Sequence, residues 1–215
     1  MDADHRIDVL FLMRCKLLIL SVLAALIAAV PASARRFSFG VEGAIALNFA
    51  SYNDIAYRTD MGYRVFDQAV RKETYPIGEV LGMATCNIGK MFRLSLLSGY
   101  CGLEQGLRMV PLELRGVVVF PQMTRSGSGL YLQAGCGVAF PLQQQFDAGA
   151  LVRGGLGYSV NLNNLARINF GFTYRLVYFN PVILDPDTDD IIPRCDIMKD
   201  DRFVSSVCFS ISIEI

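Results

Sequence analysis

Apolar side chains alternate with polar or small ones along several segments of this chain, with a period of two residues. In residues 36–49 the odd-numbered positions are mostly Phe, Val, Ile and Leu, and the even-numbered ones are Ser, Gly, Glu, Ala and Asn. Successive side chains of a β-strand point to opposite faces, so this segment predicts a strand with one oily face. The same alternation occupies residues 166–179 and the C-terminal residues 207–215.

Five further segments fit the strand pattern less regularly. In one of them, 77–86, the faces are ambiguous, because Val80, Leu81, Met83 and Ala84 divide between both sides. No stretch after residue 34 has a convincing helical period. The prediction is an all-β fold, an eight-stranded antiparallel up-and-down β-barrel. The five less regular strands are expected at 77–86, 91–103, 108–120, 130–140 and 150–160.

Strand length and connector length both favour a barrel that crosses a membrane. The segments are longer than the strands of about 5–6 residues usual in globular proteins, and a tilted strand needs about 9–11 residues to cross the hydrocarbon. In lipid no sheet edge can stay open, so the strands must close into a barrel of even number. Two alternate connectors, Ser51–Pro76 and Pro181–Arg202, are long and polar, and we expect them outside the cell.

Aromatic residues are expected in girdles at both membrane interfaces of such a barrel. With the N-terminus in the periplasm, the pattern places one group at the inner rim and another at the outer rim. The inner group is Phe37, Phe120 and Tyr158, and the outer group is Phe49, Tyr100, Phe140, Tyr178 and Phe203.

The N-terminal segment has the three parts of a secretory signal peptide. Arg14 and Lys16 precede an apolar run, 17–30, which is followed by Ala32-Ser33-Ala34. A basic region, a short apolar region and an A-x-A site are typical of a cleaved presequence. We therefore expect a presequence, 1–34, whose signal peptide occupies about 13–34 if Met13 is the start, and a mature domain, 35–215.

Composition excludes several functions. Lys plus Arg and Asp plus Glu both number 20, so no basic excess indicates nucleic-acid binding. The one histidine, His5, lies in the presequence, so the mature chain lacks the usual general base and the commonest zinc ligand. No nucleophile elbow or phosphate-binding loop occurs. We expect no enzyme activity, no catalytic residue, no cofactor and no metal.

Cysteine spacing selects no disulfide among the five mature cysteines, although export makes a bridge chemically feasible. An acidic run beginning at Asp185 has the first residues of a calcium loop. Asp190 stands where that loop needs Gly, and Asp196 stands where it needs Glu. A solvated acidic loop is the simpler interpretation. The five cysteines are Cys86, Cys101, Cys136, Cys195 and Cys208.

Charged residues gather on the face opposite the oily one, which would line the lumen. They could form an ion path or pocket, or a network of ion pairs that plugs the barrel. Buried charges must be paired, and eight strands enclose just enough room for side chains, so plugging is favoured. The network is expected to contain Glu42, Arg93, Glu113, Arg115, Arg153, Arg167, Arg175 and Glu214.

Three segments carry a resemblance to a known family: 109–115 (MVPLELR), 134–138 (AGCGV) and 154–158 (GGLGY). With these motifs the chain resembles the small OmpA-like, or porin-like, outer-membrane β-barrel family of Gram-negative bacteria. The resemblance implies contact with outer-membrane lipid and a C-terminal strand that is recognised by the barrel-assembly machinery. The chain departs from the family at Ile215, where Phe is usual.

The function we expect is a structural or surface-interaction role through the two long loops, in a monomeric protein of the outer membrane at the cell surface. The sequence identifies no extracellular partner. A second hypothesis is a narrow channel for small solutes. A third is a soluble, exported carrier of lipocalin type, which is also an eight-stranded barrel.

Overall fold

In the computed structural model the described residues are 36–59, 61–72, 74–88, 91–104, 106–120, 128–142, 147–162, 166–183 and 191–215. These residues form strands and one short 3-10 turn, Arg194–Asp196. Within the same ranges, no helix has the length and apolar character that crossing a membrane requires. The strands are β1 (Arg36–Arg58), β2 (Arg64–Arg71), β3 (Tyr75–Ile88), β4 (Phe92–Gly102), β5 (Arg108–Phe120), β6 (Gly129–Pro141), β7 (Gly149–Asn161), β8 (Arg167–Phe179) and β9 (Ile197–Glu214).

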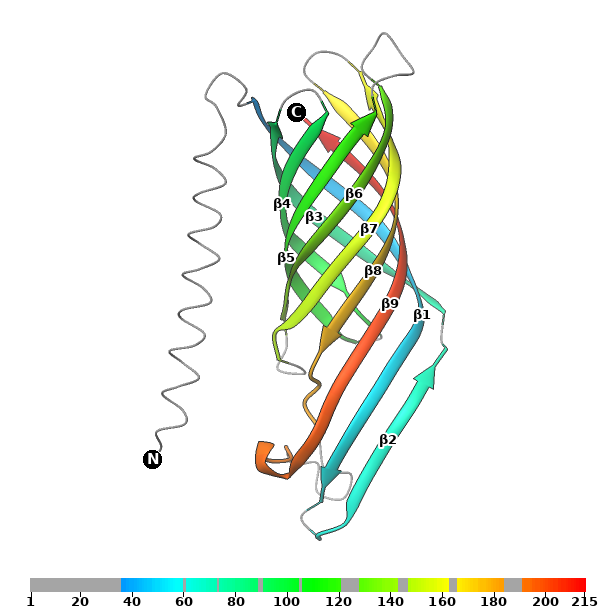
Figure 1. Ribbon diagram of the computed structural model, residues 1–215, viewed down its shortest axis with the longest axis vertical. Coiled ribbons are helices and arrows are strands. Elements are labelled where there is room, and N and C mark those ends of the chain that lie inside the picture. The colour runs from blue at the N-terminus through cyan, green and yellow to red at the C-terminus, as the bar shows by residue number, and fades with distance from the viewer. Residues whose placement is uncertain are drawn as a thin grey trace, which may run out of the picture. The chain divides into compact units, whose positions relative to one another are not determined.

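Eight of these strands close into a barrel (Figure 1). Neighbours in sequence from β3 to β9 are neighbours in the sheet, β1 lies beside β3, and β1 also pairs with β9 to complete the ring. The β1–β9 seam is antiparallel and runs from Gly40 opposite Glu214 to Tyr57 opposite Ile197. The predicted closed, antiparallel, up-and-down barrel of eight strands is therefore confirmed.

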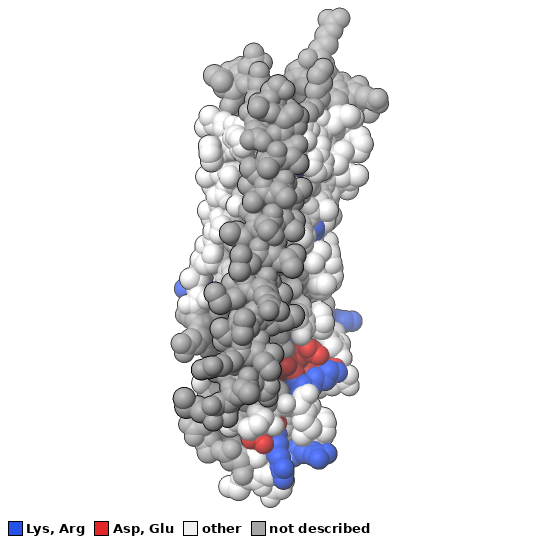
Figure 2. Space-filling model, turned by 60° about the vertical axis from the view of Figure 1, so that its left-hand side comes forward, with Lys and Arg blue, Asp and Glu red and all other residues white. Residues whose placement is uncertain are grey.

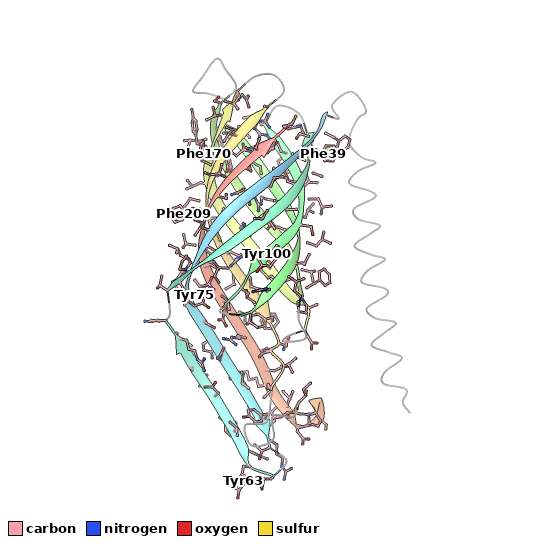
Figure 3. All side chains as sticks on the ribbon, turned by 180° about the vertical axis from the view of Figure 1, so that it is seen from behind. Phe39, Tyr63, Tyr75, Tyr100, Phe170 and Phe209 are labelled. Carbon is pink, nitrogen blue, oxygen red and sulfur yellow. The ribbon has the colours of Figure 1, made fainter. Side chains whose placement is uncertain are left out.

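Side chains alternate between the outside and the inside of this barrel, as the sequence pattern predicts. In β8, Phe172 is 45% exposed, whereas its neighbour Thr173 is 1% exposed. The ambiguous segment is resolved as well: Leu81 and Met83 of β3 point inward, and Val80 points outward. Figure 3 shows outward side chains along the whole barrel.

Both long connectors contain strand, which corrects the prediction that 51–76 and 181–202 are loops. β1 continues to Arg58 and turns at Gly62 (φ 83°) into β2, while β9 already begins at Ile197. A β-bulge between Asn48 and Ala50 shifts the register of β1. Because a bulge inserts one unpaired residue, the inside–outside alternation changes phase there, and the sequence pattern breaks although the strand continues.

Beyond the barrel, β2 and the adjoining parts of β1 and β9 form a three-stranded sheet that we call the extension (Figure 1). On one face of it, Tyr57, Ile183 and Ile192 form an apolar cluster. On the other face, Phe66 is 70% exposed, and Lys199 forms an ion pair with Asp54. The hydrogen bond that the Lys199 ammonium donates to Asp54 raises the pKa of that ammonium.

Proline within a sheet is usually confined to edge strands, strand starts and bulges, but Pro111 lies inside β5, opposite Ala139 of β6. The pairing of β5 with β4 is interrupted at this level, between Ser98–Leu112 and Cys101–Met109, because proline has no N–H to donate. The predicted presequence, 1–34, and most of the acidic run that begins at Asp185 lie outside the described residues.

Candidate functional site

The inside of the barrel holds a cluster of arginine and glutamate side chains. Arg115, on β5, binds the Glu42 carboxylate of β1 through both terminal nitrogens, with Nη1–Oε2 at 2.7 Å and Nη2–Oε1 at 3.1 Å. Its Nε donates to Glu113 Oε1 at 2.8 Å. Such bidentate, charge-assisted contacts are the strong class of hydrogen bond. Arg115 therefore joins two carboxylates that lie far apart in sequence.

Two further arginines extend the cluster. Arg153, on β7, pairs with Glu79 of β3, and its Nε and Nη1 approach Glu113 and Glu42 at 3.3 and 3.6 Å without forming hydrogen bonds. Arg175, on β8, reaches the other oxygen of Glu79 at 3.1 Å. Glu79 thus bridges two arginines across the lumen.

The charges of this cluster cancel. Three arginines face three glutamates, each at most 4% exposed; the six are Glu42, Glu79, Glu113, Arg115, Arg153 and Arg175. A buried ion pair is tolerated only where the partners compensate each other and make further hydrogen bonds. Arg175 meets this condition by also donating to Ser206 Oγ at 3.1 Å and to Cys101 Sγ at 2.6 Å. We call these six residues the charge cluster.

The structure brings together five of the eight residues that the sequence suggested for the lumen, and these five belong to the charge cluster. Glu79 was missed, because the faces of its strand could not be assigned. The sequence did contain a clue to these faces. A glutamate within a membrane-length strand is costly on the lipid face, so Glu79 indicates that the odd-numbered side chains of β3 point inward. The ion pair of Arg175 is with this missed residue, Glu79.

The remaining three suggested residues lie toward the end of the barrel at which β1 begins and β9 ends. Arg167 Nη1 is 3.4 Å from Glu214 Oε2, and Asn169 Nδ2 donates to Glu214 Oε1 at 2.8 Å. Arg93 lines the same small cavity as Glu214. Gln133 Nε2 and Asn169 Oδ1, also at this cavity, are buried without a hydrogen-bond partner. The cavity has a volume of about 20 Å³, which suits roughly one water molecule.

Apolar side chains fill the barrel at the opposite end, next to the extension. This group corrects the expectation that the inward face is only polar, charged or small. Its side chains come from β4 to β9 and pack against Leu107. The members are Cys101, Leu103, Met109, Ala139, Leu151, Val177, Phe179 and Val204. We call them the apolar plug.

Inward glycines make room for large lumen side chains, which gives the two Gly-rich segments a steric role. A Cβ on Gly135 would come within 2.5 Å of Glu113 Oε1. A Cβ on Gly157 would meet the Tyr131 ring, whose hydroxyl donates to the Phe170 carbonyl at 3.1 Å. Gly154, on the outer face of the same strand, has nothing within 4 Å of that position.

Metal and disulfide chemistry find no support in the described part of the chain. The five cysteines after the presequence are free. Among the residues described, no three His, Cys, Asp or Glu side chains are grouped so that they could hold a metal ion.

Comparisons with known proteins give structural matches only. No family model and no curated protein matches the sequence. The outer membrane protein OprG from Pseudomonas aeruginosa is 12% identical, with 84% of this chain and 95% of that chain covered and a TM-score of 0.51. Neisserial surface protein A is 10% identical, with 83% and 97% covered and a TM-score of 0.47.

A third similar structure is the outer membrane protein AlkL in lipid bilayers, at 10% identity, 87% and 94% coverage and a TM-score of 0.48. At such low identity these matches show a likeness of fold alone. The match to OprG, with its TM-score of 0.51, is the one that supports this likeness. The chain is therefore an all-β protein with the closed, eight-stranded barrel fold that the outer membrane protein OprG also has.

Proposed function

We propose that this chain is an outer-membrane barrel with a closed lumen that acts at the cell surface through its extension. The outward face supports the membrane location. Phe170 and Phe209 are 47% and 53% exposed, while charged side chains lie inside. Figure 2 agrees: where described residues are visible beside the grey ones, the barrel surface is mostly uncharged, and charged side chains gather toward the end that bears the extension. A soluble lipocalin-type carrier requires the opposite arrangement, with its apolar set inside.

Three successive obstructions support a closed lumen. The apolar plug fills the end next to the extension, the charge cluster spans the middle, and the cavity beyond it has a volume of only about 20 Å³. An ion would have to displace paired, buried charges and then pass through packed apolar side chains. This arrangement favours a plugged barrel over the narrow channel.

The observation that carries a surface role is the extension itself. Its strands continue beyond the barrel and are held by their own apolar cluster around Tyr57, Ile183 and Ile192. Among described residues, β2 pairs only with β1, so its other edge is open. An open strand edge flanked by exposed side chains such as Phe66 is a surface to which a partner strand can add.

Planar bilayers and surface labelling test this proposal. The reconstituted protein should give no stable conductance steps, whereas regular steps would support the channel hypothesis. An epitope inserted at Gly62, at the tip of the extension, should bind antibody on intact cells. The same epitope after Leu162, at the opposite end of the barrel, should require a permeabilised outer membrane. Equal accessibility of both epitopes on intact cells would contradict the proposed topology.

A further inference from the structure

A pocket lies at the mouth of the barrel, where β2 ends and β3 begins. Its volume is about 340 Å³, which is within the range of small-molecule sites. Tyr75, labelled in Figure 3, marks its position at the base of the extension. Most of the lining is polar or charged, and Leu107 adds an apolar side chain. It includes Asn48, Ser51, Arg71, Glu104 and Arg202.

Asn48, which lines this pocket, has an unsatisfied acceptor. Its side chain is 3% exposed, and its Nδ2 donates to the Leu103 carbonyl, at the edge of the apolar plug. Its Oδ1 is buried and has no hydrogen-bond partner. An amide oxygen can only accept, so a molecule that satisfies Asn48 must bring an O–H or N–H group.

The charges of the pocket favour an anion. Arg202 is fixed by an ion pair with Glu104, by Ser51 Oγ at 3.4 Å from its Nε, and by the Phe179 ring at 5.8 Å. Its charge is therefore balanced by Glu104. Arg71, an exposed residue of β2, adds one further positive charge. A guanidinium presents a planar pair of donors that matches a carboxylate.

We propose that this pocket binds a small hydroxylated carboxylate, of the sugar-acid class. The carboxylate pairs with Arg71, a hydroxyl donates to Asn48 Oδ1, and the carbon skeleton lies against Leu107. The site goes beyond the surface role proposed above, because binding would take place in front of a closed lumen. It also does not depend on which side of the membrane the extension faces.

Titration calorimetry on the full chain, refolded in detergent, tests the site with galacturonate as the probe. Galactose serves as the uncharged control, since it keeps the hydroxyls and lacks the carboxylate. We expect saturable, one-site binding of galacturonate and none of galactose. Arg71→Gln should weaken binding about tenfold or more, the effect of losing a charge-assisted hydrogen bond, and Arg71→Lys should restore part of it.

Arg64→Gln is the matched control, because Arg64 is also exposed on β2 but does not line the pocket. It should leave galacturonate binding unchanged. The proposal is overturned if galacturonate gives no saturable binding, if galactose binds equally well, or if Arg64→Gln and Arg71→Gln weaken binding to the same extent. Heat-modifiable gel mobility confirms that each variant is folded, so that loss of binding is not loss of the barrel.

Discussion

Replacing Arg175 with leucine should destabilise the barrel strongly, because it upsets a balanced set of buried charges. In the native cluster three arginines face three glutamates. The variant leaves two arginines and three glutamates, a net charge of −1 in a site without solvent. Removing one partner of a buried ion pair costs about 3–5 kcal/mol. Ser206 Oγ also loses its donor.

A second substitution separates charge from packing. Arg175→Leu with Glu79→Leu leaves two arginines and two glutamates, so the cluster is neutral again. Replacing both partners by apolar residues can be close to neutral in stability, and Arg153, which also pairs with Glu79, keeps its contacts with Glu113 and Glu42. The double variant should therefore be more stable than Arg175→Leu alone, a non-additivity that a double-mutant cycle measures.

Urea unfolding in lipid vesicles, followed by heat-modifiable gel mobility, gives the free energy of unfolding for each variant. Arg167→Leu is the comparison variant, because the Arg167 side chain is 24% exposed and Glu214 keeps its hydrogen bond from Asn169, and it should destabilise the barrel less than Arg175→Leu does. The reasoning fails if Arg175→Leu is as stable as wild type. It also fails if the double variant is less stable than the single one.

Three further predictions concern other parts of the molecule. Phe172→Arg should lower the free energy of unfolding by about 2–4 kcal/mol, because Phe172 lies on the face that we expect to meet lipid. Thr173→Ala, on the inner face, should have a mild effect. Equal effects in urea unfolding would mean that the faces are misassigned. Gly157→Ala should lower the free energy of unfolding by about 1–3 kcal/mol by overpacking against Tyr131, and Gly154→Ala, on the outer face, should not. Thermal unfolding in detergent compares the two variants, and equal costs would refute the steric role of the inward glycines. N-terminal sequencing of the membrane form should find Arg35 first, and Met1 or Met13 would refute the cleavage.

Much of the fold could be predicted because a barrel wall with one face outside and one face inside imposes period two on every strand. Phe170 and Thr173 take the faces that their parity assigned. The extension was missed because the bulge between Asn48 and Ala50 reverses parity in β1, and because β2 lies outside the barrel wall.

Within the candidate site, the pattern could identify which charges point inward but not which of them meet. Pairing across the lumen depends on the shear of the barrel, which brings Glu79 of β3 beside Arg175 of β8 although many strands lie between them in sequence. The pocket at the mouth could not be predicted either. It is formed by Arg71 and Glu104, which lie in or beside predicted connectors, and by Asn48 at the bulge.

The seam between β1 and β9 has a consequence for the order of assembly. Gly40 finds its partner in Glu214, and Ile215 exchanges backbone hydrogen bonds with Phe39. The first barrel strand therefore completes its pairing only when the last strand is in place. This closure carries the largest loop-entropy cost in the molecule. Until then β1 and β8 each expose an unpaired edge, which invites aggregation. We therefore expect closure to be the slow step of folding, and aggregation through the open edges to compete with it until β9 is in place.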